Sequence, residues 1–146
     1  MSNFYGEYNV SMDAKGRMML PADFRKQLQE SDATTFTLKC GRNNSISFYT
    51  KSQWDVIDAK LKEMNPLDPR VDDFKSLFLD GIAMVEMDSA GRILIPKQLQ
   101  EYAGLSKDVV FWLKGDKVDI WDRTRKQNFL QENKIREAAL ASELFK

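Results

Sequence analysis

The 146-residue chain contains no histidine and only one cysteine, Cys40. Without histidine it lacks the commonest general base at neutral pH, and Ser–His and Cys–His nucleophile pairs are impossible. One thiol cannot form an intramolecular disulfide or a cysteine-built zinc site, which needs about four ligands. Carboxylates therefore remain as the side chains that a metal-dependent reaction would have to use.

The chain also lacks a net charge, because 22 Lys and Arg residues balance 22 Asp and Glu residues. Residues 1–75 and residues 76–146 each contain 11 of either sign. Any nucleic-acid binding would therefore need a local basic patch, multiplied by oligomerisation. No apolar run approaches the ~18–20 residues of a membrane span, and residues 1–5 do not resemble a signal peptide, so we expect a cytoplasmic protein.

The sequence repeats itself with an offset of 75 positions. Residues 13–21 read DAKGRMMLP, and residues 88–96 read DSAGRILIP. Asp, Gly, Arg and Pro recur at identical spacing, and the three residues between Arg and Pro are apolar in both copies. A unit of about 40 residues with two or three strands can hardly bury its own apolar face. We therefore predict that the two copies pack into one pseudo-symmetric, β-rich domain.

Each copy follows the order strand, turn, strand and short helix. Apolar residues that alternate with polar ones predict strands over residues 8–12, 17–20, 82–87 and 92–95. Gly16 and Gly91 are expected to adopt a positive φ in the two turns. Pro21 and Pro96 stand where short helices begin, and Gly104 is expected to end the second of these helices.

A hairpin and longer helices complete each copy. The predicted hairpins span residues 36–48 and 109–121. Residues 50–53 have the spacing of a capping box and predict the start of a helix. Residues 71–81 carry another helical stripe, and from Thr124 onward no turn residue interrupts one long predicted helix. We place the first repeat and its helix at 1–64, a linker with a helix at 65–81, and the second repeat with its C-terminal helix at 82–146.

The repeated Asp-x-x-Gly-Arg motif has two interpretations. The structural one is a braced turn, in which Asp13 accepts backbone N–H bonds and pairs with Arg17. The functional one rests on the equivalence of Arg17 and Arg92, each of which opens a strand. Two such arginines can contact two phosphates or two bases at once, since a guanidinium makes bidentate contacts with both.

The basic residues near the motif differ between the copies. Lys15, Arg25 and Lys26 surround the first motif in the sequence, whereas the second has only Arg92 and Lys97. The sequence therefore predicts that the first copy is the better nucleic-acid patch.

These motifs resemble those of the MraZ family of transcriptional regulators, which act on the bacterial division and cell-wall gene cluster. The matching residues are Gly6-Glu7-Tyr8, Asp13 to Arg17, Leu20-Pro21, Phe24-Arg25, Asp88 with Gly91-Arg92, Ile95-Pro96 and Ile120-Trp121-Asp122. The resemblance covers essentially the whole chain, whereas one copy of the motif would indicate only the broader AbrB-like group. One departure is Lys126, which stands where family members often carry an aromatic residue five positions after Trp121.

The resemblance implies a β-rich α+β fold: a swapped-hairpin, AbrB-like barrel made of two tandem repeats, with flanking helices. It also implies a ring-shaped homo-oligomer that binds repeated elements in double-stranded promoter DNA and associates with the nucleoid. We predict no catalytic residue, no metal, no cofactor and no membrane contact. The predicted DNA-binding residues are Arg17, Lys15, Asp13, Arg92, Asp88 and Arg25.

Two other functions remain open at this point. One is a carboxylate–metal phosphoesterase that uses Asp13 and Asp88, although the missing histidines and the placement of both aspartates in equivalent turns argue against it. The other is an antitoxin-like protein-interaction module on the same fold, in which residues 124–146 grip a partner.

Several conspicuous residues receive structural interpretations. Trp54, Trp112 and Trp121 each fall in a periodic apolar pattern and are expected in the core. The aspartates within residues 68–73 are interpreted as a solvated helix start, and Cys40 as a buried rather than a reactive hairpin residue.

Overall fold

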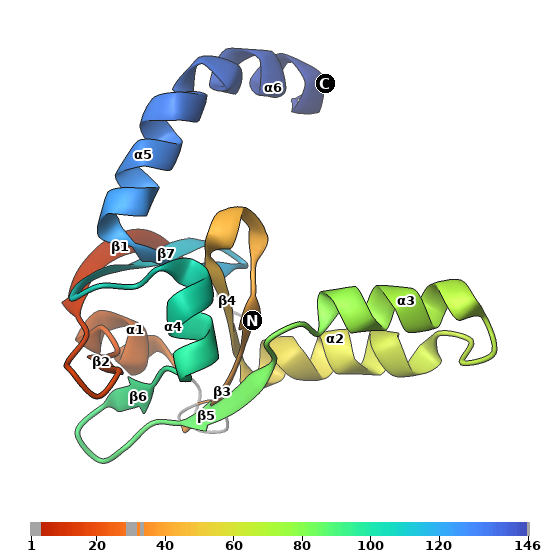
Figure 1. The fold of residues 1–146 in the computed structure, drawn as a ribbon, viewed down its shortest axis with the longest axis horizontal. Helices are drawn as coiled ribbons and strands as arrows, with labels where there is room; N and C mark the ends of the chain where they lie inside the picture. The colour runs from red at the N-terminus through yellow and green to blue at the C-terminus, as the bar shows by residue number, and fades with distance from the viewer. Residues whose placement is uncertain (1–3, 29–31, 33, 146) are drawn as a thin grey trace.

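The same series of elements occurs twice along the chain in the computed structural model, which describes residues 4–28, 32 and 34–145 (Figure 1). The strands are β1 (Phe4–Ser11), β2 (Arg17–Met19), β3 (Thr35–Cys40), β4 (Ile46–Thr50), β5 (Ala83–Glu86), β6 (Arg92–Leu94), β7 (Asp108–Gly115) and β8 (Val118–Asp122). The helices are α1 (Ala22–Gln27), α2 (Lys51–Glu63), α3 (Pro69–Phe78), α4 (Lys97–Ala103), α5 (Arg123–Asn133) and α6 (Glu137–Leu144). Short 3₁₀ turns are η2 (Arg42–Asn44) and η3 (Lys134–Arg136).

The two repeats exchange strands. The main sheet is antiparallel with the order β1-β7-β8-β4-β3-β5, so β1 pairs with β7 of the other repeat and β5 pairs with β3. The strands β2 and β6, one from each repeat, form a separate two-stranded ribbon. The β-rich α+β class and the two-repeat organisation are therefore confirmed.

The main sheet is not closed on itself. Its edge strands are β1 and β5, and no ladder joins them within the described residues. The hydrogen-bonded sheet thus does not show the closed barrel that the resemblance implies, and the swapped-hairpin barrel stays a prediction.

Four phenylalanines form the centre of the core. Phe24 of α1 lies with its ring centroid 5.0 Å from Phe111, which is also 5.0 Å from Phe48, and Phe36 stacks on Phe48 at 4.9 Å. All four side chains are fully buried. Burying an aromatic side chain stabilises a fold by roughly 1.5–3 kcal/mol. Because the rings come from both repeats, neither repeat has this core without the other.

The helical arms extend from this core. Thr50 and Gln53 form the predicted capping box at the start of α2, which packs against α3 through stacked Trp54 and Phe78, 6.5 Å apart. Asp68 caps α3 by accepting the Arg70 N–H, as expected for a helix start. The α2–α3 pair projects away from the sheet, and α5 rises from a different part of the molecule (Figure 1).

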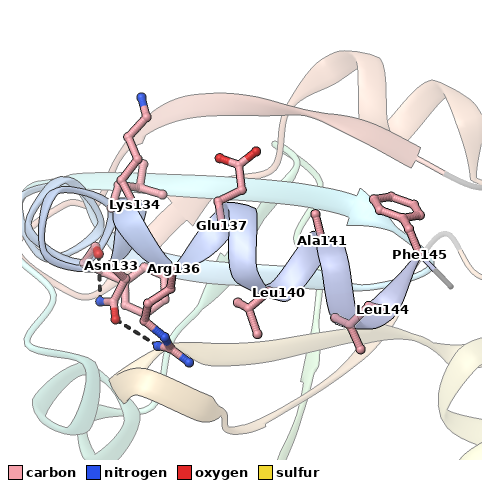
Figure 2. Close-up of a pocket in the computed structure, with 10 residues that line it drawn as sticks. Asn133, Lys134, Arg136, Glu137, Leu140, Ala141, Leu144 and Phe145 are labelled. Atoms are coloured by element: carbon pink, nitrogen blue, oxygen red, sulfur yellow. Dashed lines mark hydrogen bonds between the residues drawn. The ribbon is translucent and has the colours of Figure 1, made fainter.

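The single long C-terminal helix predicted from residue 124 onward is wrong. The tail consists of α5, the turn η3 and α6, which runs in a different direction from α5 (Figure 1). The side chain of Asn133 accounts for the interruption: its Nδ2 donates to the Phe129 carbonyl at 2.9 Å, and its Oδ1 accepts from Arg136 Nη1 at 2.9 Å (Figure 2). Such side-chain bonds compete with the regular helix.

Lys126, which stands where relatives often carry an aromatic residue, packs α5 against the sheet. It is largely buried, forms an ion pair with Glu7, and lies with Nζ 4.3 Å from the centroid of the Trp112 ring. Phe129, one turn further along α5, packs on Trp121 at 5.2 Å. Trp121 is buried as predicted, whereas Trp112 is half-buried between Trp121 and this lysine. No helix in the described part of the chain is long and apolar enough to cross a membrane.

Candidate nucleic-acid interface

The first turn is braced from within. Asp13 Oδ1 accepts the backbone N–H groups of Lys15 at 3.0 Å and Arg17 at 2.9 Å, while Asp13 Oδ2 accepts from Arg17 Nε at 2.8 Å. Gly16 has φ +86° and donates its N–H to the Asp13 carbonyl at 3.0 Å. The positive φ explains why glycine stands here, because a side chain disfavours this conformation.

The second turn reproduces the first. Asp88 Oδ1 accepts the N–H groups of Ala90 at 3.0 Å and Arg92 at 2.8 Å, and Oδ2 accepts from Arg92 Nε at 2.9 Å. Gly91 also has φ +86°. Both glycine predictions are confirmed, and so is the braced-turn interpretation of the motif.

Each brace leaves part of its arginine available. Of the side-chain nitrogens of Arg17 and Arg92, only Nε donates to the aspartate, and the terminal Nη groups have no hydrogen-bond partner among the described residues. Each arginine side chain is 34% exposed. The hydrogen bonds, first among them the arginine backbone N–H, hold the pKa of Asp13 and of Asp88 below its ordinary value. The carboxylates therefore stay ionised and fix the guanidinium planes.

The β2–β6 ribbon places both arginines on one outer face. Arg17 pairs with Leu94 and Met19 pairs with Arg92, and directly opposed residues of a ladder share a face. The alternate pair, Met18 and Ile93, is buried in the core. The ribbon is thus anchored through its inner face, while its outer face carries two arginines and two exposed apolar side chains.

The two turns lie at opposite ends of this ribbon, each beside the other repeat. The Gly16 carbonyl accepts the Ile95 N–H at 2.8 Å, and the Gly91 carbonyl accepts the Leu20 N–H at 2.9 Å. The swap therefore determines which side chains surround each turn.

Arg25 is not beside the first motif, contrary to the sequence prediction. Its Nε donates to the Leu20 carbonyl at 3.1 Å, and its guanidinium lies against Gly91 of the second turn. The equivalent residue of the second repeat, Gln100, bonds the Ile95 carbonyl at 2.7 Å and lies against Gly16. Neighbouring positions in the sequence favour the first turn, whereas the pairing of strands between the two repeats brings Arg25 to the second.

The cations are consequently shared between the ends. The first turn carries Lys15 and Arg17, and the second carries Arg92 and Arg25. Arg25 therefore does not support the expected advantage of the first copy, which stays a prediction. Lys15 is exposed at the tip of its turn.

The two halves of the chain match a known family. A family model described as "MraZ protein, putative antitoxin-like" matches residues 3–76 and 78–146. The chain belongs to the MraZ family. The chain is 38% identical over 141 residues to the "Transcriptional regulator MraZ" of Acetivibrio thermocellus, covering 97% of the chain and 96% of the relative. A protein of the same name from Cytophaga hutchinsonii is 38% identical, and the match covers 97% of the chain and 93% of the relative. One from Christiangramia forsetii is 33% identical, and the match covers 99% of the chain and 94% of the relative.

The names of these relatives support a transcriptional regulator. Asp13 and Asp88, the pair considered for a phosphoesterase, belong to separate turns and each binds its own arginine. Within the described residues, no group of three or more Cys, Asp or Glu side chains is arranged to hold a metal ion.

Three residues on the ribbon or beside its turns were not among the predicted ones. Gln100 stands 75 positions after Arg25, so an extended alignment of the repeats would have found it. Met19 and Leu94 read as apolar strand residues, and only the register of β2 with β6 places them beside the arginines.

Proposed function

We propose that this chain is a sequence-specific DNA-binding regulator that contacts double-stranded promoter DNA with the outer face of the β2–β6 ribbon. The observation that carries the proposal is the pair of braced arginines on one face of a ribbon anchored in the core. A two-stranded ribbon fits the major groove, and a guanidinium can bond guanine O6 and N7 or a phosphate.

The predicted residues then have distinct roles. Arg17 and Arg92 present their free Nη groups to base edges or phosphates, and Lys15 and Arg25 add phosphate contacts at the two ends. Asp13 and Asp88 do not themselves attract DNA, because they are anionic. They orient the arginines, which lowers the entropy lost when the arginines bind.

Affinity would come from several subunits. One ribbon offers few contacts, and a homo-oligomer that engages repeated promoter elements multiplies them. We propose a ring, as the family resemblance implies, with the division and cell-wall gene cluster as target and the nucleoid as location. In each subunit, residues 1–64 and 82–146 would form the two units of a swapped-hairpin barrel, joined by 65–81.

Two unlike surfaces support the contact between subunits. The bend at η3 creates an open apolar hollow of about 600 Å³ between α5 and α6. Leu140 and Leu144 point to one side of α6, and Lys134 and Glu137 point to the other (Figure 2). The turn between α2 and α3 exposes Leu67 elsewhere on the molecule. A contact between different patches is heterologous and generates a ring when the rotation closes.

The charges of the two surfaces are complementary. Residues 51–80 contain seven Asp and Glu residues and five Lys and Arg residues, a net charge of −2. Residues 123–145 contain five Lys and Arg residues and three Glu residues, a net charge of +2. We therefore propose that the α2–α3 pair of a second copy occupies the hollow.

Light scattering tests this contact. The wild type should form an assembly larger than a dimer, and Leu144→Glu should shift it toward the 16.9 kDa monomer. Ile135→Glu is the matched control, because Ile135 is 89% exposed on the same tail but does not line the hollow. A monomeric wild type at micromolar concentration would contradict the ring.

An electrophoretic shift with the DNA upstream of the chain's own gene tests the function itself. We expect retarded complexes that persist against excess unrelated DNA. If the wild type binds both DNAs equally, sequence-specific regulation by this chain is wrong.

The apolar hollow also favours a second candidate, the antitoxin-like interaction module. In that case the hollow would hold a different protein, and a stable complex with that partner would leave promoter DNA unshifted. Formation of the larger self-assembly together with a specific shift distinguishes the regulator from this alternative.

A further inference from the structure

A second pocket lies away from the ribbon, between the main sheet and α3. It has a volume of about 470 Å³, within the range typical of small-molecule sites. Lys39 from β3 and Lys117 from the β7–β8 hairpin line it, together with Arg42 and the half-buried ring of Phe78.

Lys39 is an unusual residue for a protein interior. The residue is only 7% exposed, yet no carboxylate among the described residues forms an ion pair with it. Its Nζ donates to the Cys40 carbonyl at 3.0 Å and lies 4.4 Å from the centroid of the Phe78 ring. Burying a charged amine without a counter-ion is unfavourable, so most buried lysines are paired.

Lys117 places a second cation beside Lys39 in this pocket. Burial and the charge of Lys117 together hold the pKa of Lys39 below its ordinary value, with Asp80 and Cys40 opposing them. Asp119 is not the counter-ion of Lys39, because its carboxylate pairs with Lys114 at 2.6 Å and with Lys117 at 3.5 Å. Three cations and one carboxylate, Asp80, line the pocket, so an anion would be electrostatically favoured there.

The remaining wall of the pocket is apolar and aromatic. Phe74 and Leu77 of α3 are exposed on it, at 43% and 79%, and Phe74 stacks on Phe78 at 5.3 Å. On the opposite side the Tyr102 hydroxyl donates to the Gly41 carbonyl at 2.5 Å. The pocket thus combines a buried cation with a surface suited to a flat apolar group.

We propose that this pocket binds a small anionic ligand, in which a phosphate or carboxylate pairs with Lys39 and Lys117 and an attached apolar ring packs on Phe74 and Leu77. The ligand site is independent of the DNA-binding face, because none of its residues belongs to the ribbon. It would give the regulator a means of responding to a metabolite of this chemical class.

Calorimetric titration of the full-length protein tests the proposal with phenyl phosphate as the probe. We expect saturable binding of one molecule per chain in the millimolar range or tighter. Inorganic phosphate should bind at least about tenfold more weakly, because it lacks the ring, and benzoate tests whether a carboxylate substitutes for the phosphate. Lys39→Met and Lys117→Met should each weaken phenyl phosphate binding at least about tenfold, while Lys60→Met, on the exposed side of α2, should leave it unchanged.

A second readout separates binding from folding. Lys39→Met replaces the unpaired cation by an apolar side chain of similar length, so its melting temperature without ligand should be equal to or above that of the wild type. Absence of saturable phenyl phosphate binding, or unchanged binding by Lys39→Met, would overturn the proposal. A third outcome would also overturn it: the wild type does not bind the probe, and Lys39→Met no longer forms the oligomer. A carboxylate of a second copy, and not a small ligand, would then pair with Lys39.

Discussion

The two turns of the ribbon are alike within themselves and different in their surroundings. Corresponding hydrogen bonds of the two braces differ by no more than 0.1 Å. Their neighbours differ: Gln100 lies against the first turn and Arg25 against the second. Geometry within a turn is thus set by its own five residues, while its electrostatic environment is set by the other repeat.

The helical arms show the opposite behaviour. Trp54 packs between Tyr49 and Phe78 at the start of the α2–α3 pair, whereas its counterpart Lys126 lies over Trp112. The turns are held between the two repeats, while each arm packs largely on its own repeat. Trp54 and Lys126 occupy equivalent positions, but their different side chains pack different helices, the α2–α3 pair and α5, against similar parts of the sheet.

The largest expected effect concerns DNA affinity at the two ends. Arg17→Ala and Arg92→Ala each remove one guanidinium per subunit, worth roughly 1–3 kcal/mol if it is bidentate to a base. Across several engaged subunits, each change should abolish the specific shift of promoter DNA while oligomer size and melting temperature persist. If Arg17→Ala binds like the wild type and Arg92→Ala does not, the ends are not equivalent.

The next effect concerns stability. Gly16→Val and Gly91→Val each force a β-branched residue to φ +86°, at a cost of about 1–2 kcal/mol. Gly16→Val should cost more, because its Cβ would also lie 3.3 Å from the Ile95 carbonyl oxygen, whereas the close neighbours of Gly91 are atoms of the Arg25 side chain. Urea unfolding measures both, and unchanged midpoints would refute the strain argument.

A smaller effect should appear in acid. The folded state holds the pKa of both turn aspartates below the ordinary 3.8, so the unfolded chain binds their protons first as the pH falls. Each brace therefore contributes stability above the ordinary pKa and loses it as the pH drops through the folded value. Asp13→Asn and Asp88→Asn should each flatten the dependence of melting temperature on pH below about pH 4, to a similar extent.

The smallest effect sharpens the difference between the ends. Arg25→Gln removes the cation from the second turn, and Gln100→Arg adds one to the first. The salt dependence of DNA binding should become shallower in the former and steeper in the latter, by roughly 0.9 in the log–log slope for each phosphate contact. Lys60→Ala provides a control for the change in net charge. Equal slopes in all variants would place both residues outside the contact surface.

Local patterns in the sequence predicted the local features well. The glycine turns, the Thr50 capping box and the end of α4 at Gly104, which has φ +58°, all follow from neighbouring residues alone. The position of Arg25 depends on the pairing of strands between the two repeats, and the interruption at Asn133 depends on side-chain hydrogen bonds that no turn residue indicates. Long-range pairing and side-chain competition are therefore where sequence reasoning fell short.

Photo-crosslinking from the outer face of the ribbon tests the central claim most directly. A benzophenone amino acid at Leu94, which is 55% exposed between the arginines, should crosslink to promoter DNA. The same group at Val56, which is 58% exposed on α2, should not. Crosslinking from Val56 but not from Leu94, in proteins that both shift the DNA, would contradict the assignment of the ribbon as the DNA-binding face.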